Sequence, residues 1–364
     1  MVVAACVMVC NEEDVIAHTL QSALEAGCTH FVVLDTGSID GTVAAVRQWA
    51  AESKQEPIIR QTSFGDFSTT RNELLEVCRQ HLPDDAVLLL LDANESVEAG
   101  SRLERPDETW QAEFVQYRLK SGTNALLFRT LRLVRNVAGW AYRFPVHEVL
   151  GHPTIRAAEA TDVLVTQDRM ANPDDSRKTQ RRWPRDLRTI DAYLQQHPDE
   201  PRMIFYRAQT LACLGRTAEA IQAYERRARH TGGFAKERAQ AMIEIGKLTT
   251  DWTRARGWWA QAWTEFGCME AALALSQEAR RHRQWAAAFA LAQAACQSPR
   301  DTILFAQAED YAYSRWHHLG IVAWYAGQFK VGKAAVIAAL QERPNSRIDQ
   351  ENLAWYLART SGPQ

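Results

Sequence analysis

Residues 87–95 read VLLLLDANE: five apolar residues are followed at once by polar groups that can ligate a cation or accept a hydrogen bond. Acidic residues before this run and Ser96 after it give it the length of a strand buried on both faces. We expect a central parallel strand, which would place Asp92, Asn94 and Glu95 at the sheet edge where open α/β folds bind ligands. Such oxygen ligands suit a divalent cation that holds phosphates, whereas the plainer reading is a polar turn.

The first half of the chain alternates between strand-like and helix-like segments. The apolar, β-rich runs are residues 2–9, 31–34, 58–59, 87–91, 114–119, 130–134 and 163–165. Helical spacing follows the first three runs, with Asn11 as the expected N-cap of the first helix and Ser68 near the start of the third. Strands and helices joined by short connections predict an α/β domain, a mostly parallel sheet with helices on both faces.

Composition limits the class of protein. The chain has 364 residues, of which 46% are hydrophobic and 24% charged, so a globular protein of two or three domains is expected. The apolar first ten residues carry no positive leader and are read as a strand, and no apolar run reaches the length of a membrane span. Seven cysteines without a CxxC pair favour a reducing compartment. We therefore expect a cytoplasmic protein without membrane insertion.

The two halves carry charge of opposite sign. Residues 1–170 hold 15 Lys and Arg against 24 Asp and Glu, a net charge of −9, and the remaining residues hold 27 against 20, or +7. A basic half can mark an anionic partner. The alternative is two modules with differently solvated faces, because net charge concerns association and not fold.

Three loops are expected at one edge of the sheet, after Val9, Leu34 and Leu91. In the second loop, Asp35 can accept from a ribose or a base N–H, and Gly37 lets the backbone approach a ligand. This turn has neither the GK[ST] ending of a P-loop nor the spacing of a GxGxxG turn. Some other arrangement must hold the phosphates of a nucleotide.

Four ordered motifs resemble family-2 glycosyltransferases of the GT-A fold, and the resemblance covers about residues 1–170. The motifs are residues 9–13 (VCNEE), 34–42 (LDTGSIDGT), 66–72 (DFSTTRN) and 91–95 (LDANE). By this resemblance, Asp35 reads the base, Arg71 contacts the base or pyrophosphate, and Asp92 meets the ribose or the metal. The other residues that it implies at the nucleotide-sugar pocket are Val9, Asn11, Glu13 and Gly37.

A later segment, residues 145–150 (PVHEVL), resembles the Val-His-Glu segment of the same family. The resemblance implies that His147 completes the shell of a Mn²⁺ or Mg²⁺ ion with Asp92 and Asn94, and that Glu148 is the base that deprotonates the acceptor. Two positions depart from the family pattern. Asn94 stands where the second aspartate of the family is usual, and Thr166-Gln167 stands where a further histidine often follows the last strand.

Beyond a polar segment, residues 170–182, which we expect to be a linker, strand-like runs disappear. Ala-rich helical segments have turns near Gly215, Thr250, Arg283 and Gly327, at spacings of 35, 33 and 44 residues. The first two spacings match the ~34-residue helix-turn-helix period of tetratricopeptide repeats (TPR), and the third allows an insertion at residues 298–310. We expect two domains, 1–170 and an all-α TPR-like domain at 171–364. Its tryptophans, Trp355 among them, are expected to pack between helices rather than form a sugar platform.

The expected activity is transfer of a sugar from a nucleotide-diphosphate sugar, most simply a UDP-sugar, to a hydroxyl, with inversion implied by the resemblance. The acceptor expected is a protein, a peptide or a glycan held by the repeat array. DNA with hydroxymethylated bases is an alternative acceptor for a viral type of enzyme, and a non-catalytic scaffold is an alternative of another class. The DNA alternative depends on a basic run formed by Arg177, Lys178, Arg181, Arg182, Arg185 and Arg188.

Overall fold

A computed structural model describes residues 1–105, 109–121, 124–168, 173–299, 302–307 and 309–360. The chain divides into two compact units, Met1–Tyr193 and Leu194–Gln364. The division falls within helix α4 (Pro173–Gln196), so the domain boundary near residue 170 stays a prediction. Residues 173–182, expected to belong to a linker, are helical instead. The sequence explains this, since Pro173 followed by two aspartates is a favourable helix start.

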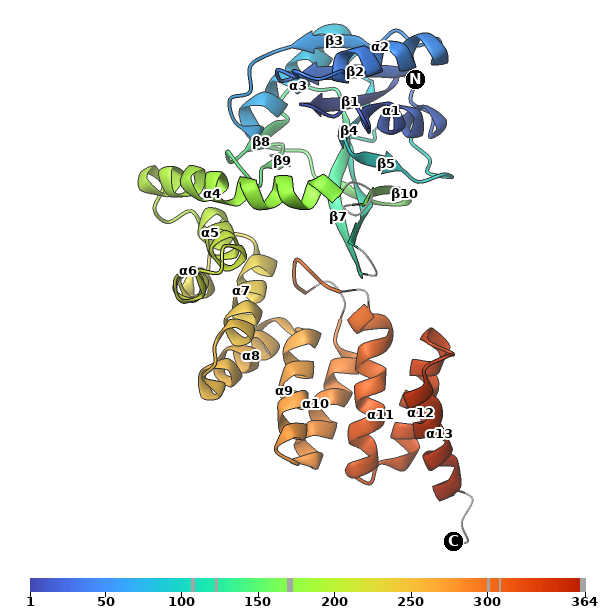
Figure 1. Ribbon diagram of the computed structural model, residues 1–364, viewed down its shortest axis with the longest axis vertical. Coiled ribbons are helices and arrows are strands. Elements are labelled where there is room, and N and C mark those ends of the chain that lie inside the picture. The colour runs from blue at the N-terminus through green and yellow to red at the C-terminus, as the bar shows by residue number, and fades with distance from the viewer. Residues whose placement is uncertain (106–108, 122–123, 169–172, 300–301, 308, 361–364) are drawn as a thin grey trace. The chain divides into compact units, whose positions relative to one another are not determined.

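An eight-stranded mixed sheet forms the centre of the first unit (Figure 1). Its strand order is β3-β2-β1-β4-β7-β6-β10-β5. The strands are β1 (Val3–Val9), β2 (His30–Asp35), β3 (Ile58–Gln61), β4 (Val87–Asp92), β5 (Glu95–Val97), β6 (Ala112–Ser121), β7 (Asn124–Arg135) and β10 (Ala158–Asp168). Strands β1 to β4 are parallel, as expected, and β6 and β10 are parallel to each other. The antiparallel strand β7 joins these two parts, so the sheet is mixed.

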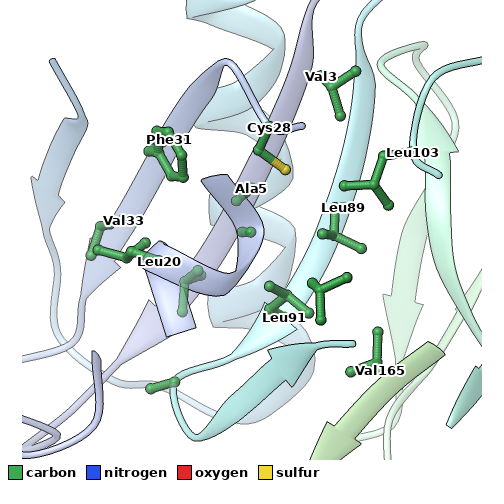
Figure 2. Close-up of a cluster of buried hydrophobic side chains, with 14 of the residues drawn as sticks. Val3, Ala5, Leu20, Cys28, Phe31, Val33, Leu89, Leu91, Leu103 and Val165 are labelled. Carbon is green, nitrogen blue, oxygen red and sulfur yellow. The ribbon is translucent and has the colours of Figure 1, made fainter. Parts of the chain in front are cut away.

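Helices cover both faces of the parallel part, as the apolar spacing predicts. The helices are α1 (Ile16–Glu25), α2 (Thr42–Ser53) and α3 (Phe67–His81). Alternate residues of the strands enter two separate cores: Leu89 and Leu91 pack with Leu20 of α1 (Figure 2), whereas Leu88 and Leu90 pack with α3. Because β4 is buried on both faces, its apolar run is continuous rather than alternating.

Asn11 differs from its expected role. Helix α1 begins at Ile16, and no side chain caps its N-terminus. Asn11 has a φ of 56°, in the left-handed region that asparagine tolerates. Its side chain is directed at the neighbouring loop, where its Oδ1 accepts a hydrogen bond from the Ile39 N–H at 2.9 Å. The N-cap prediction was therefore wrong, because a bond to another loop competes with the local one.

The second unit is a succession of helix hairpins. Its helices are α5 (Pro201–Cys213), α6 (Thr217–Arg229), α7 (Ala235–Leu248), α8 (Trp252–Phe266), α9 (Met269–Arg281), α10 (Trp285–Gln297), the π-helix η1 (Asp310–Ser314), α11 (Arg315–Tyr325), α12 (Phe329–Glu342) and α13 (Arg347–Thr360). The four expected turns join α5 to α6, α7 to α8, α9 to α10 and α11 to α12, and the predicted insertion separates α10 from η1. Consecutive helices pack on one another throughout. Among the described residues, no helix has the length and apolar character needed to cross a membrane.

Candidate active site

Strand register gathers the expected residues at one edge of the sheet. Val9 lies opposite Asp35 in the β1–β2 pair, and Met8 lies opposite Asp92 in the β1–β4 pair. The carboxyl ends of these three parallel strands therefore meet. Two further residues reach the same edge. Arg71 comes from the second turn of α3, and Glu148 comes from the segment just before the short strand β9 (Val149–Gly151). Strand β9 pairs with β8 (Ala141–Arg143).

Asn11 and Glu13, expected to border the nucleotide pocket, fasten the loop after β2. Besides the Asn11 bond to Ile39, Oε2 of Glu13 accepts a hydrogen bond from the Gly41 N–H at 2.6 Å. The carbonyl oxygen of Val9 accepts from both the N–H and the hydroxyl of Thr36, each at 3.0 Å. These contacts fix the loop where a nucleotide would lie. Their roles toward a nucleotide stay a prediction.

Asp35 shapes the turn that it begins. Its side chain is fully buried; Oδ1 accepts from the Ser38 N–H at 3.0 Å and Oδ2 from Nε2 of Gln61 at 3.1 Å. Gly37 has a φ of 103°, a conformation that glycine adopts without strain. A base N–H would have to share a carboxylate that is already hydrogen-bonded. A contact between Asp35 and the nucleotide base therefore stays a prediction.

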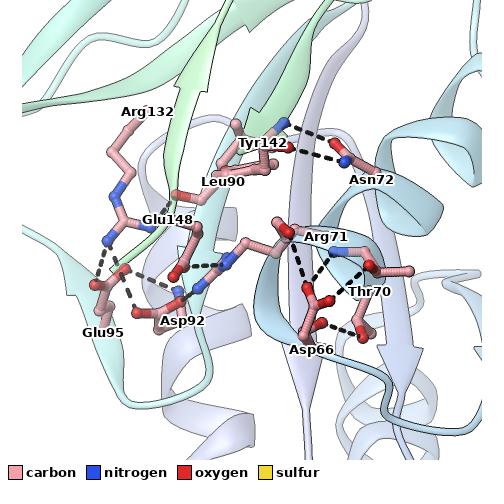
Figure 3. Close-up of polar contacts among 12 residues, drawn as sticks. Asp66, Thr70, Arg71, Asn72, Leu90, Asp92, Glu95, Arg132, Tyr142 and Glu148 are labelled. Atoms are coloured by element: carbon pink, nitrogen blue, oxygen red, sulfur yellow. Dashed lines mark hydrogen bonds and ion pairs between the residues drawn. The ribbon is translucent and has the colours of Figure 1, made fainter. Parts of the chain in front are cut away.

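Arg71 joins two of the expected site residues. Asp66 caps α3 by accepting from the Thr69 N–H at 2.8 Å, which places Arg71 in the helix's second turn, beneath the end of β4. There its Nη2 donates to Oδ1 of Asp92, and its Nε donates to Oε1 of Glu148 at 2.7 Å (Figure 3). Burial opposes the charged guanidinium, but the carboxylates of Asp92 and Glu148 prevail and hold the pKa of Arg71 above its usual range. A buried charge of this kind is stable only when paired.

A second arginine, Arg132 on β7, lies on the other side of Asp92. Its Nη2 donates to Oε1 of Glu95 at 2.7 Å and lies 3.8 Å from Oδ2 of Asp92, and its Nη1 donates to the carbonyl of Leu90 at 3.2 Å (Figure 3). Burial raises the pKa of Asp92, but the two arginines outweigh it and hold that pKa well below its usual range. Burial raises the pKa of the Glu95 carboxyl to about 7 although Arg132 opposes the shift. Glu95 also accepts from the Asp92 N–H at 2.8 Å, which fixes the turn after β4.

Tyr142 on β8 covers Arg71. The guanidinium carbon lies 5.5 Å from the centre of the Tyr142 ring, within the range of a cation–π contact. The side chain of Asn72 holds the Tyr142 backbone in both directions: its Nδ2 donates to the carbonyl at 3.0 Å and its Oδ1 accepts from the N–H at 2.7 Å. This clamp fixes β8 against α3, and with it the segment that carries Glu148.

The predicted cation ligands have other partners. Oδ1 of Asn94 accepts a hydrogen bond from Nε2 of Gln167 at 2.7 Å, and Asp92 is flanked by Arg71 and Arg132. His147 lies in a bend before β9 with a φ of 53°, not on a strand. Within the described ranges, no group of three or more His, Cys, Asp or Glu side chains is arranged to hold a metal ion. This donor set does not fit a divalent cation, because only one carboxylate remains and two cations already flank it.

Reasoning from sequence missed several residues of this network. They are Arg132, Tyr117 and Tyr142, together with Gln167, noted only as a departure from the family pattern, and Glu95, expected as an oxygen ligand of a cation but bonded to Arg132 and Tyr117 instead. Tyr117 donates to Oε1 of Glu95 at 2.7 Å. One sequence feature pointed to this network: at Gln167 the chain departs from the family pattern. Gln167 lies directly opposite Glu95 in the β10–β5 pair.

The basic run on α4 gives no support to DNA as the acceptor. Arg182 pairs with Asp186 at 3.1 Å, and Arg185 lies over the ring of Phe64 at 5.4 Å. Arg188 is exposed. The side chains of Arg177, Lys178 and Arg181 lie outside the described part of the chain.

Comparison with known proteins assigns the first unit. Residues 4–131 match the family model described as Glycosyl transferase family 2. The first unit is a family-2-like glycosyltransferase domain. None of the curated proteins compared with the chain matches it. The family match covers the strands and loops that carry Asp35, Arg71 and Asp92, whereas Glu148 lies beyond it.

Solved structures similar to the chain include helical repeat proteins. One is MamA, with 13% identity over 47% of this chain and 87% of that chain and a TM-score of 0.36. Another is YrrB, described as a TPR protein with an unusual peptide-binding site, with 12% identity, 48% and 84% coverage and a TM-score of 0.35. The anaphase-promoting complex assembly Cut9–Hcn1 has 15% identity over 50% of this chain and 35% of that chain, with a TM-score of 0.35. The helix hairpins of the second unit form a TPR-like domain.

Proposed function

We propose that the protein transfers a sugar from a nucleotide-diphosphate sugar, a UDP-sugar in the simplest case, to a hydroxyl group of an acceptor. One observation carries this proposal: Arg71 joins Asp92, at the end of a central strand, to Glu148, from a segment 77 residues further along the chain than Arg71. In this proposal Asp92 binds the donor, the Arg71 guanidinium faces the phosphates and Glu148 is the base for the acceptor, and the contacts of Arg71 with both carboxylates support it. The family-2-like domain supports the same activity.

The reaction is a single displacement at the anomeric carbon. The acceptor oxygen forms a bond to that carbon while the bond to the diphosphate oxygen breaks, and the nucleotide diphosphate leaves with the bonding electrons. Glu148 takes the proton of the attacking hydroxyl, a contribution of roughly 10²–10⁴-fold for general-base catalysis. Because Arg71 holds Oε1 of Glu148, Oε2 is the atom that receives the proton. Attack opposite the leaving group inverts the configuration at carbon.

The positive charge at the phosphates comes from this chain's own side chains. The sequence predicts a divalent cation on Asp92, Asn94 and His147, but the surroundings of these residues do not fit such an ion. The displacement described above therefore uses no divalent cation. Arg71 lies where it can stabilise the charge that develops on the leaving diphosphate. Its cation–π contact with Tyr142 and its two ion pairs keep it in place before the donor binds.

The acceptor is proposed to be a protein, a peptide or a glycan that binds the TPR-like unit. Helices α11 and α13 form a hollow of about 280 Å³ whose lining includes Trp324, Tyr325, Ile348 and Trp355. Trp355 is 65% exposed, contrary to the expectation that it lies between helices, and Tyr325 beside it in this lining is 57% exposed. Exposed aromatic rings of this kind suit both apolar side chains and sugar rings. We place the enzyme in the cytoplasm because its seven cysteines lack paired spacing.

The proposal is tested by release of nucleoside diphosphate from a panel of nucleotide sugars, with and without candidate acceptors. The wild-type chain should turn over at least one donor, and Glu148→Gln should lower turnover by at least about 100-fold while donor binding is kept. Glu76→Gln is the matched control, because Glu76 lies on α3 with its side chain 52% exposed and contacts its helix neighbours Arg79 and Gln80. A wild-type protein that binds a donor but never turns it over would favour the non-catalytic scaffold.

A further inference from the structure

Two positions where a cation ligand would be expected carry amides, and the two amides bind each other. Oδ1 of Asn94 accepts from Nε2 of Gln167 at 2.7 Å. Gln167 is in turn held at the β10–β5 pair, where its Oε1 lies 3.3 Å from the hydroxyl of Tyr117. An amide oxygen brings no negative charge to a dication, and this one is already an acceptor. The hydrogen bond between the two amides therefore occupies the Asn94 oxygen in the turn after β4, which makes it a poor ligand for a cation.

The remaining carboxylate, Asp92, already lies between two cations. Arg71 donates to its Oδ1, and Nη2 of Arg132 lies 3.8 Å from its Oδ2. A dication on Asp92 would have to displace one guanidinium group or lie beside both, although Glu148 and Glu95 also pair with these two groups. Arg132 itself is held by Glu95 and by the carbonyl of Leu90, with only 14% of its side chain exposed. Its position is thus fixed by the fold before any ligand arrives.

We propose that this transferase domain binds its donor diphosphate without a divalent cation, and that Arg132 together with Arg71 supplies the positive charge there. The proposal rests on the proposed function, since it concerns the phosphates of the same donor. Arg132 acts as a positioning residue: it fixes the Asp92 carboxylate from the side opposite Arg71 and adds a second positive charge behind it. Asp92 is then available to the ribose hydroxyls through the 37% of its side chain that is exposed.

Calorimetry with UDP, GDP, CDP and ADP tests the proposal on the full chain. At least one nucleoside diphosphate should bind in excess EDTA as tightly as it binds with Mn²⁺. Arg132→Gln should weaken that binding by roughly tenfold, the usual loss for a charged partner. Arg132→Lys keeps the charge and should restore most of the affinity, which a purely structural role for the guanidinium would not explain.

Two further variants complete the test. Arg129→Gln is the matched control, because Arg129 lies on the same strand but is exposed and pairs with Glu159; it should bind as the wild type does. The double variant Asn94→Asp with Gln167→His should gain Mn²⁺ binding and nucleotide binding that strengthens with Mn²⁺. Wild-type binding that appears only with Mn²⁺, or unchanged affinity in Arg132→Gln, would overturn the inference. If no nucleoside diphosphate binds in either condition, the proposed function itself fails.

Discussion

Asp92 and Glu148 are both acidic, and one buried guanidinium group keeps them together. Arg71 has only 7% of its side chain exposed, so its pairs with these carboxylates lie in a region where screening by water is weak. A pair of this kind adds little net stability, but removing one partner leaves a buried charge uncompensated. The network therefore fixes geometry: it holds the carboxylates of Asp92 and Glu148 at a set separation.

Asp92→Ala tests the donor end of this network. The nucleoside diphosphate that stabilises the wild type in thermal-shift experiments should give no shift with the variant, because the carboxylate proposed to meet the ribose is gone and Arg71 has lost one of its two carboxylate partners. Asp85→Ala is a suitable control, since Asp85 is exposed in the loop before β4. A thermal shift of wild-type size in Asp92→Ala would remove Asp92 from the site.

The residues that could be predicted at this scale are those at strand ends. The apolar run of β4 followed by Asp92 places that carboxylate by a general rule of parallel sheets, and a known family resemblance adds Arg71 and Glu148. Arg132 could not be placed, because its position depends on an antiparallel pairing between β4 and β7 across more than 40 residues of sequence. Nothing local in its neighbourhood distinguishes it from Arg129 or Arg135.

At the scale of elements, one buried side chain fixes the end of α3. Nδ2 of Asn136 donates toward three carbonyl oxygens at the C-terminus of that helix, those of Cys78 (3.3 Å), Leu82 (3.1 Å) and Pro83 (3.2 Å). The carbonyls of Cys78 and Pro83 also accept from the backbone N–H groups of Leu82 and Ala86, so the amide adds a further donor at a helix end where carbonyls have few intrahelical partners. Asn136 itself is 2% exposed. It holds α3, and with it Arg71, against the turn after β7.

Asn136→Asp should therefore destabilise the transferase domain. The substitution replaces an N–H donor with a carboxylate that faces carbonyl oxygens, and we expect a loss of about 3 kcal/mol in the free energy of unfolding. Urea unfolding followed by circular dichroism measures this loss. As a control, Gln48→Glu on the exposed face of α2 should change the unfolding free energy by less than about 0.5 kcal/mol. Equal stability of Asn136→Asp and the wild type would contradict the capping role.

Element boundaries show where local signals suffice. Turns with glycine in the left-handed region, Gly215 and Gly327, end helices of the repeat unit as the sequence predicts. The α7–α8 hairpin depends instead on packing: Trp259 lies against Gly246, where a Cβ atom would come within 2.1 Å of the indole nitrogen. The start of α1 was misplaced because Asn11 bonds to a loop 28 residues away, a partner that no local pattern reveals.

At the scale of the whole molecule, stability should depend on a histidine of the TPR-like unit. His318 is 5% exposed, and its Nε2 lies 2.9 Å from the hydroxyl oxygen of Ser276. Burial, with smaller effects of Arg280 and His317, lowers the pKa of His318 to about 4 from an ordinary value of 6.5. The unfolded chain therefore binds the proton more tightly than the folded chain. The stability due to neutral His318 is complete above about pH 6.5 and is lost as the pH falls toward 4.

Between pH 7.5 and pH 5 this linkage should lower the free energy of unfolding by about 2 kcal/mol. Urea unfolding of the full chain and of a non-titrating variant at the two pH values measures this loss as their difference, because the Glu95 carboxyl, whose pKa is raised to about 7, contributes a change of opposite sign to both. His318→Gln, which keeps a hydrogen-bonding group but does not titrate, should lose less stability over the same interval. If the variant and the wild type lose the same amount, the acid sensitivity belongs to other groups.

The organisation into an α/β unit and a helical unit could be predicted, because strand-like periodicity stops and helical periodicity continues. The acceptor could not be predicted, because exposed aromatic residues such as Trp355 have the same sequence signature as buried ones. We propose that the nucleotide of the donor binds at the edge formed by the ends of β1, β2 and β4.

Hydrogen–deuterium exchange with and without the best-binding nucleoside diphosphate tests that claim most directly. We expect slower exchange in residues 9–13, 35–41, 66–72 and 92–97, which hold Asn11, Asp35, Arg71 and Asp92. We expect no change in the helices from α5 to α13. Protection confined to those helices, or no protection at the sheet edge when the nucleotide is bound, would contradict it.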